Sequence, residues 1–177
     1  MKRAEFEHAV RAAGAILDTD EVLVIGSQAI HGTLSAPFPE AERSIEVDIA
    51  ALGKDATLAA DLIDGSIGEL SPFQSTFGYY AQGVTAETAV LPGGWRKRLV
   101  PYRSASTNGV TALCLELHDL WISKAVAGRD KNREFCGAML ERCLVEADTL
   151  RARLRKVRGI PAEVRQSVDA LVTRWDE

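Results

Sequence analysis

A short, wholly apolar run that ends at a glycine constrains the fold of this chain more than any other feature. Residues 22–25 read Val-Leu-Val-Ile and are followed at once by Gly26 and Ser27. An apolar, β-branched run of this length that stops at a turn residue is typical of a buried strand. We interpret the next residues as a helical turn with Ser27 as its N-cap. The predicted order is therefore strand, glycine, serine, helix.

A second strand with a different pattern follows a proline-containing loop. In residues 45–49, Ile, Val and Ile alternate with Glu46 and Asp48. Side chains two residues apart project from the same face of a strand, so the two carboxylates are expected to lie side by side.

The remaining hydrophobic patterns predict an α/β (α+β) chain with a helical end. Before residue 116 we expect helices at residues 2–17 and 55–63 and short strands at residues 79–84, 88–91, 98–103 and 110–115. After it we expect helices at about residues 118–128, 131–145, 149–157 and 161–175. These elements predict one domain over residues 1–177, with an α/β core at 1–115 and a C-terminal helical portion at 116–177.

Composition excludes several classes of protein. The longest apolar runs are far shorter than the roughly 20 residues that a membrane-spanning helix needs. The first residues lack the apolar stretch of a signal peptide, so we expect a cytoplasmic protein. The net charge is −4, which gives no global basic field, and no DNA sequence recognition is expected. The three cysteines form no Cys-x-x-Cys pair.

The paired carboxylates are the feature that suggests chemistry. Two like charges so close repel, and Mg²⁺ relieves this because it binds one or two carboxylates and completes its shell with phosphate oxygens and water. Gly26 allows close approach of the backbone, and Ser27 offers a hydroxyl and N–H groups to a phosphate. Together they suggest a metal–triphosphate site. Each half also has a plainer interpretation: Gly26-Ser27 as a turn and cap, and the acidic strand as a solvated outer face.

The order of these motifs resembles the nucleotidyltransferase superfamily with a polymerase-β-like fold. Its signature is an apolar strand that ends in Gly-Ser, a short helix, and then an acid-x-acid strand. Residues 26–30, 44–49, 77–84, 91–95 and 118–124 look more specifically like a bacterial family of nucleotidyltransferases of unknown function. At a greater distance the chain is similar to the nucleotidyltransferase toxins of abortive-infection and toxin–antitoxin systems. The resemblance implies a mixed β-sheet flanked by helices.

The resemblance also implies roles for particular residues. Glu46 and Asp48 would hold Mg²⁺ or Mn²⁺, and Gly26 and Ser27 would hold the phosphates of an NTP. Lys124 would be the downstream cation, and the segment from Lys124 through Arg129 to Lys131 could meet the triphosphate from one helix face. A solvated basic face paired with neighbouring acids is the alternative.

Two departures from the superfamily pattern bear on activity. The first metal ligand is Glu46, where the superfamily more often has Asp. A third carboxylate, which usually activates the attacking hydroxyl, is not evident, and Glu69 and Glu87 are the candidates.

The sequence therefore predicts transfer of a nucleoside monophosphate from an NTP to an unidentified hydroxyl of RNA, a protein or a small molecule. A toxin-like role beside an antitoxin partner or in phage defence is part of this hypothesis. The alternative is a catalytically silent nucleotide-binding or protein-interaction module. The basic residues of segment 151–158 could contact RNA phosphates or an acidic partner, or form a solvated helix face.

Overall fold

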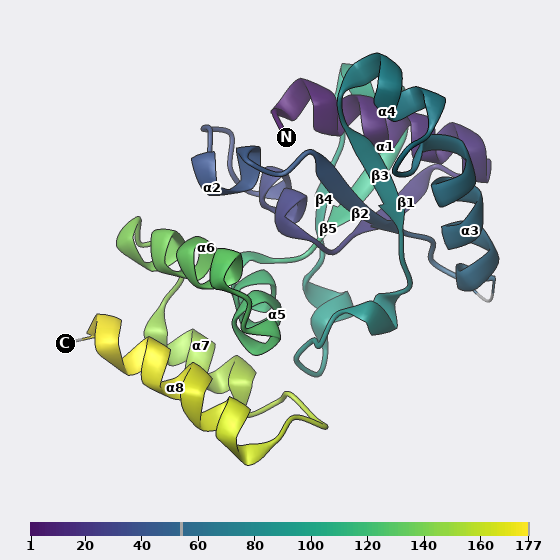
Figure 1. Cartoon of the computed structure of the whole chain (residues 1–177). Helices are drawn as coiled ribbons and strands as arrows, with labels where there is room; N and C mark the ends of the chain where they lie inside the picture. The colour runs from purple at the N-terminus through teal and green to yellow at the C-terminus, as the bar shows by residue number, and fades with distance from the viewer. Residues whose placement is uncertain (54, 177) are drawn as a thin grey trace. The chain divides into compact units, whose positions relative to one another are not determined.

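The computed structural model describes residues 1–53 and 55–176. It divides into two compact units (Figure 1). The sheet unit comprises Met1–Thr88 and Leu99–Leu115, and the helical unit comprises Ala89–Arg98 and the chain from Glu116 onward. The prediction of one domain over residues 1–177 stays a prediction.

A five-stranded mixed sheet forms the centre of the sheet unit. Its strands are β1 (Glu21–Val24), β2 (Glu46–Ala50), β3 (Tyr80–Gly83), β4 (Val100–Tyr102) and β5 (Thr111–Cys114). Their order is β3-β2-β1-β5-β4. Strand β1 pairs antiparallel with β2 and parallel with β5, β2 pairs parallel with β3, and β4 pairs antiparallel with β5. The predicted α+β class with a mixed sheet is confirmed.

Helices α1 (Arg3–Leu17) and α3 (Ala56–Ile67) contact each other and the central strands (Figure 1). Helix α1 forms because its apolar residues recur at helical spacing, and that face supplies Phe6, Val10 and Ala13, all 0% exposed. Two short helices, α2 (Pro39–Glu42) and α4 (Pro72–Phe77), complete this part, each with proline in its first turn.

The α-helices of the helical unit are α5 (Leu117–Ala127), α6 (Asp130–Glu141), α7 (Ala147–Leu154) and α8 (Ala162–Asp176). Trp121 on α5 is wholly buried, and its indole N–H donates to the Cys136 carbonyl at 3.0 Å. Leu120, Met139 and Leu150 are also 0% exposed. The four predicted C-terminal helices are confirmed. No helix in the described part of the chain is both long and apolar enough to cross a membrane.

Two predictions about local structure are wrong. Residues 88–91 do not form a strand: η2 (Ala86–Thr88) is a 3₁₀ turn, and the chain then leaves the sheet unit, so no strand is there for it to pair with. The turn after β1 is a 3₁₀ helix, η1 (Ser27–Gly32), whose N-cap is Gly26 and not Ser27. The predicted strands near residues 22–25, 45–49, 79–84, 98–103 and 110–115 are confirmed with shifted ends.

Candidate functional site

The two acids of β2 lie on the less buried face of that strand. Glu46 and Asp48 are half-buried, whereas Val47 and Ile49 between and after them are 0% exposed. This alternation follows from the pleat of the strand, which turns successive side chains to opposite faces. Val47 and Ile49 enter the core, and Glu46 and Asp48 lie together on the opposite face of the strand.

Gly26 makes room for one of these acids. A Cβ added at position 26 would overlap the Asp48 carboxylate, starting with its Oδ2 atom. Ile25, just beyond the end of β1, donates its N–H to the Asp48 carbonyl at 3.3 Å, so the chain after β1 stays aligned with β2. The missing side chain of Gly26 therefore leaves room for the Asp48 carboxylate, and the predicted contact of Gly26 with a phosphate stays a prediction.

Strand β3 holds the other acid in place. The parallel register pairs Glu46 with Tyr80 and Asp48 with Gln82. The Tyr80 hydroxyl donates to Glu46 Oε2 at 2.9 Å. The Tyr80 hydroxyl thus orients the Glu46 carboxylate, and the missing side chain of Gly26 leaves room for the Asp48 carboxylate.

A third acid, Glu69, is close enough to Tyr80 for its charge to act on the phenol. Burial raises the pKa of Tyr80 above its usual value of 10, and the hydrogen bond to Glu46 and the charges of Glu46, Glu69 and Asp48 raise it further. Tyr80 therefore stays protonated and remains a donor to Glu46 throughout the physiological range.

The two candidates for a third carboxylate lie in exposed positions. Glu69 follows the end of α3, and Glu87 lies in η2. Among the described residues, no group of three or more His, Cys, Asp or Glu side chains is arranged to hold a metal ion. The two carboxylates of β2 lie together on one strand face, and both their role as metal ligands and the third carboxylate stay predictions.

Ser27 begins η1 beside these acids. Its side chain is half-buried, and its Oγ accepts a hydrogen bond from Gln28 Nε2 at 3.3 Å. Gln28 is itself 0% exposed and also donates to the Ala41 carbonyl at 2.9 Å. The neighbouring glutamine thus fixes the turn that carries Ser27.

The predicted cations belong to the helical unit. Lys124 lies in the last turn of α5, with its Nζ 5.9 Å from the centre of the Phe135 ring. The proposed single helix face from Lys124 to Lys131 is wrong, because Gly128 takes a left-handed conformation (φ 65°) that ends α5. Arg129 is the N-cap of α6, and Lys131 lies in its first turn, both exposed.

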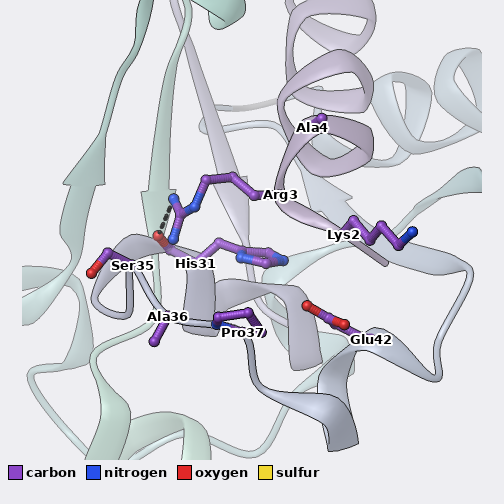
Figure 2. Close-up of a pocket in the computed structure, with 8 residues that line it drawn as sticks. All are labelled: Lys2, Arg3, Ala4, His31, Ser35, Ala36, Pro37 and Glu42. Atoms are coloured by element: carbon purple, nitrogen blue, oxygen red, sulfur yellow. Dashed lines mark hydrogen bonds between the residues drawn. The ribbon is translucent and has the colours of Figure 1, made fainter.

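A separate cavity of about 420 Å³ opens at the start of α1 (Figure 2). Lys2, Arg3, His31 and Glu42 are among the residues that line it. The guanidinium of Arg3 donates to the His31 carbonyl at 3.2 Å and to the carbonyl of Leu34 (Figure 2 shows the former contact). The charge of Arg3 is therefore engaged by the backbone, and the lining is made of residues other than those predicted to bind metal or nucleotide.

Sequence reasoning missed Tyr80 and Gln82 as neighbours of the acids. Both residues belong to a segment whose pattern predicts a strand. The local sequence does not indicate that this strand pairs parallel with β2 and places Tyr80 opposite Glu46. The signal that could have found Tyr80 is its position at the start of an apolar strand, where a buried phenol needs a hydrogen-bond partner.

Comparison with known proteins assigns the family. A family model described as "Nucleotidyltransferase of unknown function (DUF6036)" matches residues 5–177. No curated protein and no solved structure matches the chain. The match spans nearly the whole sequence, so the chain belongs to this family of nucleotidyltransferases of unknown function.

Proposed function

We propose that this protein transfers a nucleoside monophosphate from an NTP to a hydroxyl group, in the cytoplasm. The acceptor oxygen attacks the α-phosphorus and loses its proton, and the bond from that phosphorus to the bridging oxygen breaks to release pyrophosphate. The observation that carries the proposal is the carboxylate pair of β2, in which Asp48 occupies the space left by Gly26.

The donor set fits a hard divalent cation. Two carboxylates on one strand face supply oxygen ligands, and Mg²⁺ in nucleotide enzymes is commonly bound by one or two carboxylates with substrate phosphates and water. Glu46 and Asp48 would hold Mg²⁺ or Mn²⁺. When bound, the ion would neutralise charge that develops on the phosphates.

The chain's own residues supply the remaining tasks. Tyr80 orients Glu46 through its 2.9 Å hydrogen bond. The backbone at Gly26 and Ser27 is proposed to receive the phosphates, and the nucleotide contacts expected of Lys124, Arg129 and Lys131 in the helical unit stay predictions. Phosphoryl transfer requires mainly positioning and charge neutralisation, so these groups are sufficient in kind.

One observation favours a second candidate function. In the described part of the chain, no third metal-ligating side chain joins Glu46 and Asp48. A protein with this arrangement could bind nucleotide without transferring it and act as a nucleotide-binding or protein-interaction module.

Calorimetry with NTP and Mg²⁺ tests both functions. We expect binding to the wild-type protein and its loss when Glu46→Ala and Asp48→Ala are combined. The matched control combines Asp20→Ala and Asp61→Ala, two exposed acids of the sheet unit, and removes the same charge. Absence of NTP binding by the wild-type protein contradicts both functions.

Transfer is tested separately with NTP labelled at the α-phosphate, incubated with cellular RNA, protein and small-molecule extracts. Label on one of these fractions supports the transferase function. NTP binding without any transfer of label contradicts it and supports the nucleotide-binding module. The toxin-like role predicts growth arrest on induced expression, relieved by the combined Glu46→Ala and Asp48→Ala changes and by an antitoxin partner.

A further inference from the structure

The helical unit carries a basic surface that the proposed transfer reaction does not use. It is formed by the loop of residues 91–98 and the end of α7 with the turn after it, residues 154–160. The Gly93 N–H donates to the Lys156 carbonyl at 3.0 Å, so these two segments, far apart in sequence, lie against each other. No Asp or Glu occurs in residues 88–115 or 149–162.

Five cations of this surface are exposed: Arg96, Lys97, Arg155, Lys156 and Arg158. Within the described part of the chain, none of the five forms an ion pair. We call these five side chains and Trp95 the basic surface. Unpaired cations gathered in this way attract a polyanion.

Two other arginines, one in the first segment and one just before the second, have a different role. Arg98 donates to both carboxylate oxygens of Asp119, at 2.8 and 3.0 Å, and Arg153 Nε lies 3.5 Å from the same carboxylate. Asp119 is 0% exposed, so this cluster is a buried clamp. Arg98 also donates to the Gly93 carbonyl at 3.3 Å, which fastens the loop.

The turn after α7 is fastened as well. Arg165 on α8 donates to the Leu154 carbonyl at 2.5 Å and to the Val157 carbonyl at 2.9 Å. The backbone of the turn is therefore held by α8, while the side chains of Arg155, Lys156 and Arg158 point to solvent. The backbone that carries these three cations is therefore held in place before any ligand binds.

Trp95 determines which polyanion fits this surface. Its indole is half-exposed, and the Arg96 guanidinium lies 5.2 Å from the ring centre. An indole and a guanidinium are the groups on which unpaired bases stack, whereas an acidic protein segment gains little from them. We propose that the basic surface binds single-stranded nucleic acid, with the five cations on phosphates and Trp95 against a base.

Fluorescence anisotropy with a labelled 12-nucleotide RNA and the matching single-stranded DNA tests this proposal. The assay contains EDTA and no NTP, so its outcome is independent of the transfer reaction. If all five cations contact phosphates, log K falls with log salt with a slope of about −3.5, or roughly 100-fold between 50 and 200 mM. Tighter binding of the RNA than of the DNA would assign the surface to RNA, and the reverse to DNA.

Variants separate the two kinds of contact. Trp95→Ala should weaken binding about tenfold or more at every salt concentration, and Trp95→Phe should restore most of it. Combining Arg155→Gln with Arg158→Gln should reduce the slope by about 1.4. The matched control combines Arg133→Gln with Arg174→Gln, two exposed arginines outside the surface, and should leave the slope unchanged.

Three outcomes would overturn the proposal. The first is no binding of either oligonucleotide at 50 mM salt. The second is an equal loss of slope in the two double variants, which would mean that only total charge matters. The third is competition by poly-glutamate as effective as by the oligonucleotide, with no effect of Trp95→Ala, which would identify the surface as a site for an acidic protein.

Discussion

The carboxylate of Asp48 lies where a side chain on Gly26 would have to be. The glycine is not needed for its backbone conformation, since its φ of −85° and ψ of −164° are open to any residue. What position 26 requires is the absence of a Cβ. The neighbouring strand β2 thus determines which residue can occupy position 26.

Gly26→Ala is therefore expected to displace the Asp48 carboxylate and to weaken Mg²⁺-dependent NTP binding at least about tenfold, or about 1.4 kcal/mol. Calorimetry measures the binding, and circular dichroism checks that the fold is retained. The overlap should also lower the free energy of unfolding by about 1–3 kcal/mol.

Gly65→Ala is the matched control for that variant. Gly65 lies inside α3, is exposed, and has open space where a Cβ would stand. Alanine there should raise the free energy of unfolding by about 0.5–1 kcal/mol and leave NTP binding unchanged. Equal NTP affinity in the two glycine variants would contradict the role assigned to Gly26.

Tyr80→Phe tests the hydrogen bond that orients Glu46. Loss of the hydroxyl should lower the free energy of unfolding by about 1 kcal/mol, because it removes one bond to a half-buried carboxylate. Urea denaturation of Tyr80→Phe, Glu46→Gln and the double variant gives the coupling energy of the pair. Strict additivity of the two changes would mean that the bond does not contribute.

The local sequence pattern predicted the two acids of this site, Glu46 and Asp48, but not the residues that contact them. The alternation of Glu46 and Asp48 with apolar residues is a property of five consecutive residues, and it correctly places both acids on one face. The contact of Glu46 with Tyr80 depends on how β2 and β3 pair, which is a long-range choice of register. Only the assembled sheet reveals it.

Two predictions failed because they used only local composition and spacing. Residues 88–91 have the composition of a strand, but a strand needs a neighbour, and here the chain passes from the sheet unit to the helical unit. The face from Lys124 to Lys131 assumes an unbroken helix, and the left-handed conformation of Gly128 separates the two lysines onto α5 and α6. A glycine in the left-handed conformation ends a helix, so helical spacing does not continue from Lys124 past Gly128 to Lys131.

Asp119→Ala should strongly destabilise the helical unit. It would leave the guanidinium of Arg98, and that of Arg153, without the carboxylate that is 0% exposed between them. Loss of one partner from a buried pair typically costs about 3–5 kcal/mol, because the remaining charge is uncompensated. Chemical denaturation measures the loss.

Asp148→Ala is the control for the buried clamp. Asp148 also pairs with an arginine, at 3.6 Å from Arg151, but its side chain is fully exposed to water. Its removal is expected to leave the free energy of unfolding unchanged, because water screens such a pair. Similar losses in the two aspartate variants would show that burial of Asp119 does not determine its contribution.

His31 should make the stability of the protein depend on pH. Its side chain is 5% exposed, and burial lowers the pKa of His31 below its ordinary value of 6.5, with the charge of Arg3 acting in the same direction and the Met1 carbonyl against it. The unfolded chain therefore binds a proton more readily than the folded one, so folding is favoured above pH 6.5 and disfavoured as the pH falls below it. We expect the free energy of unfolding, measured with urea, to decrease from pH 7 to pH 5. His31→Gln should show a smaller decrease over the same range, because the glutamine does not titrate; an identical decrease in the variant would assign the pH dependence to other groups.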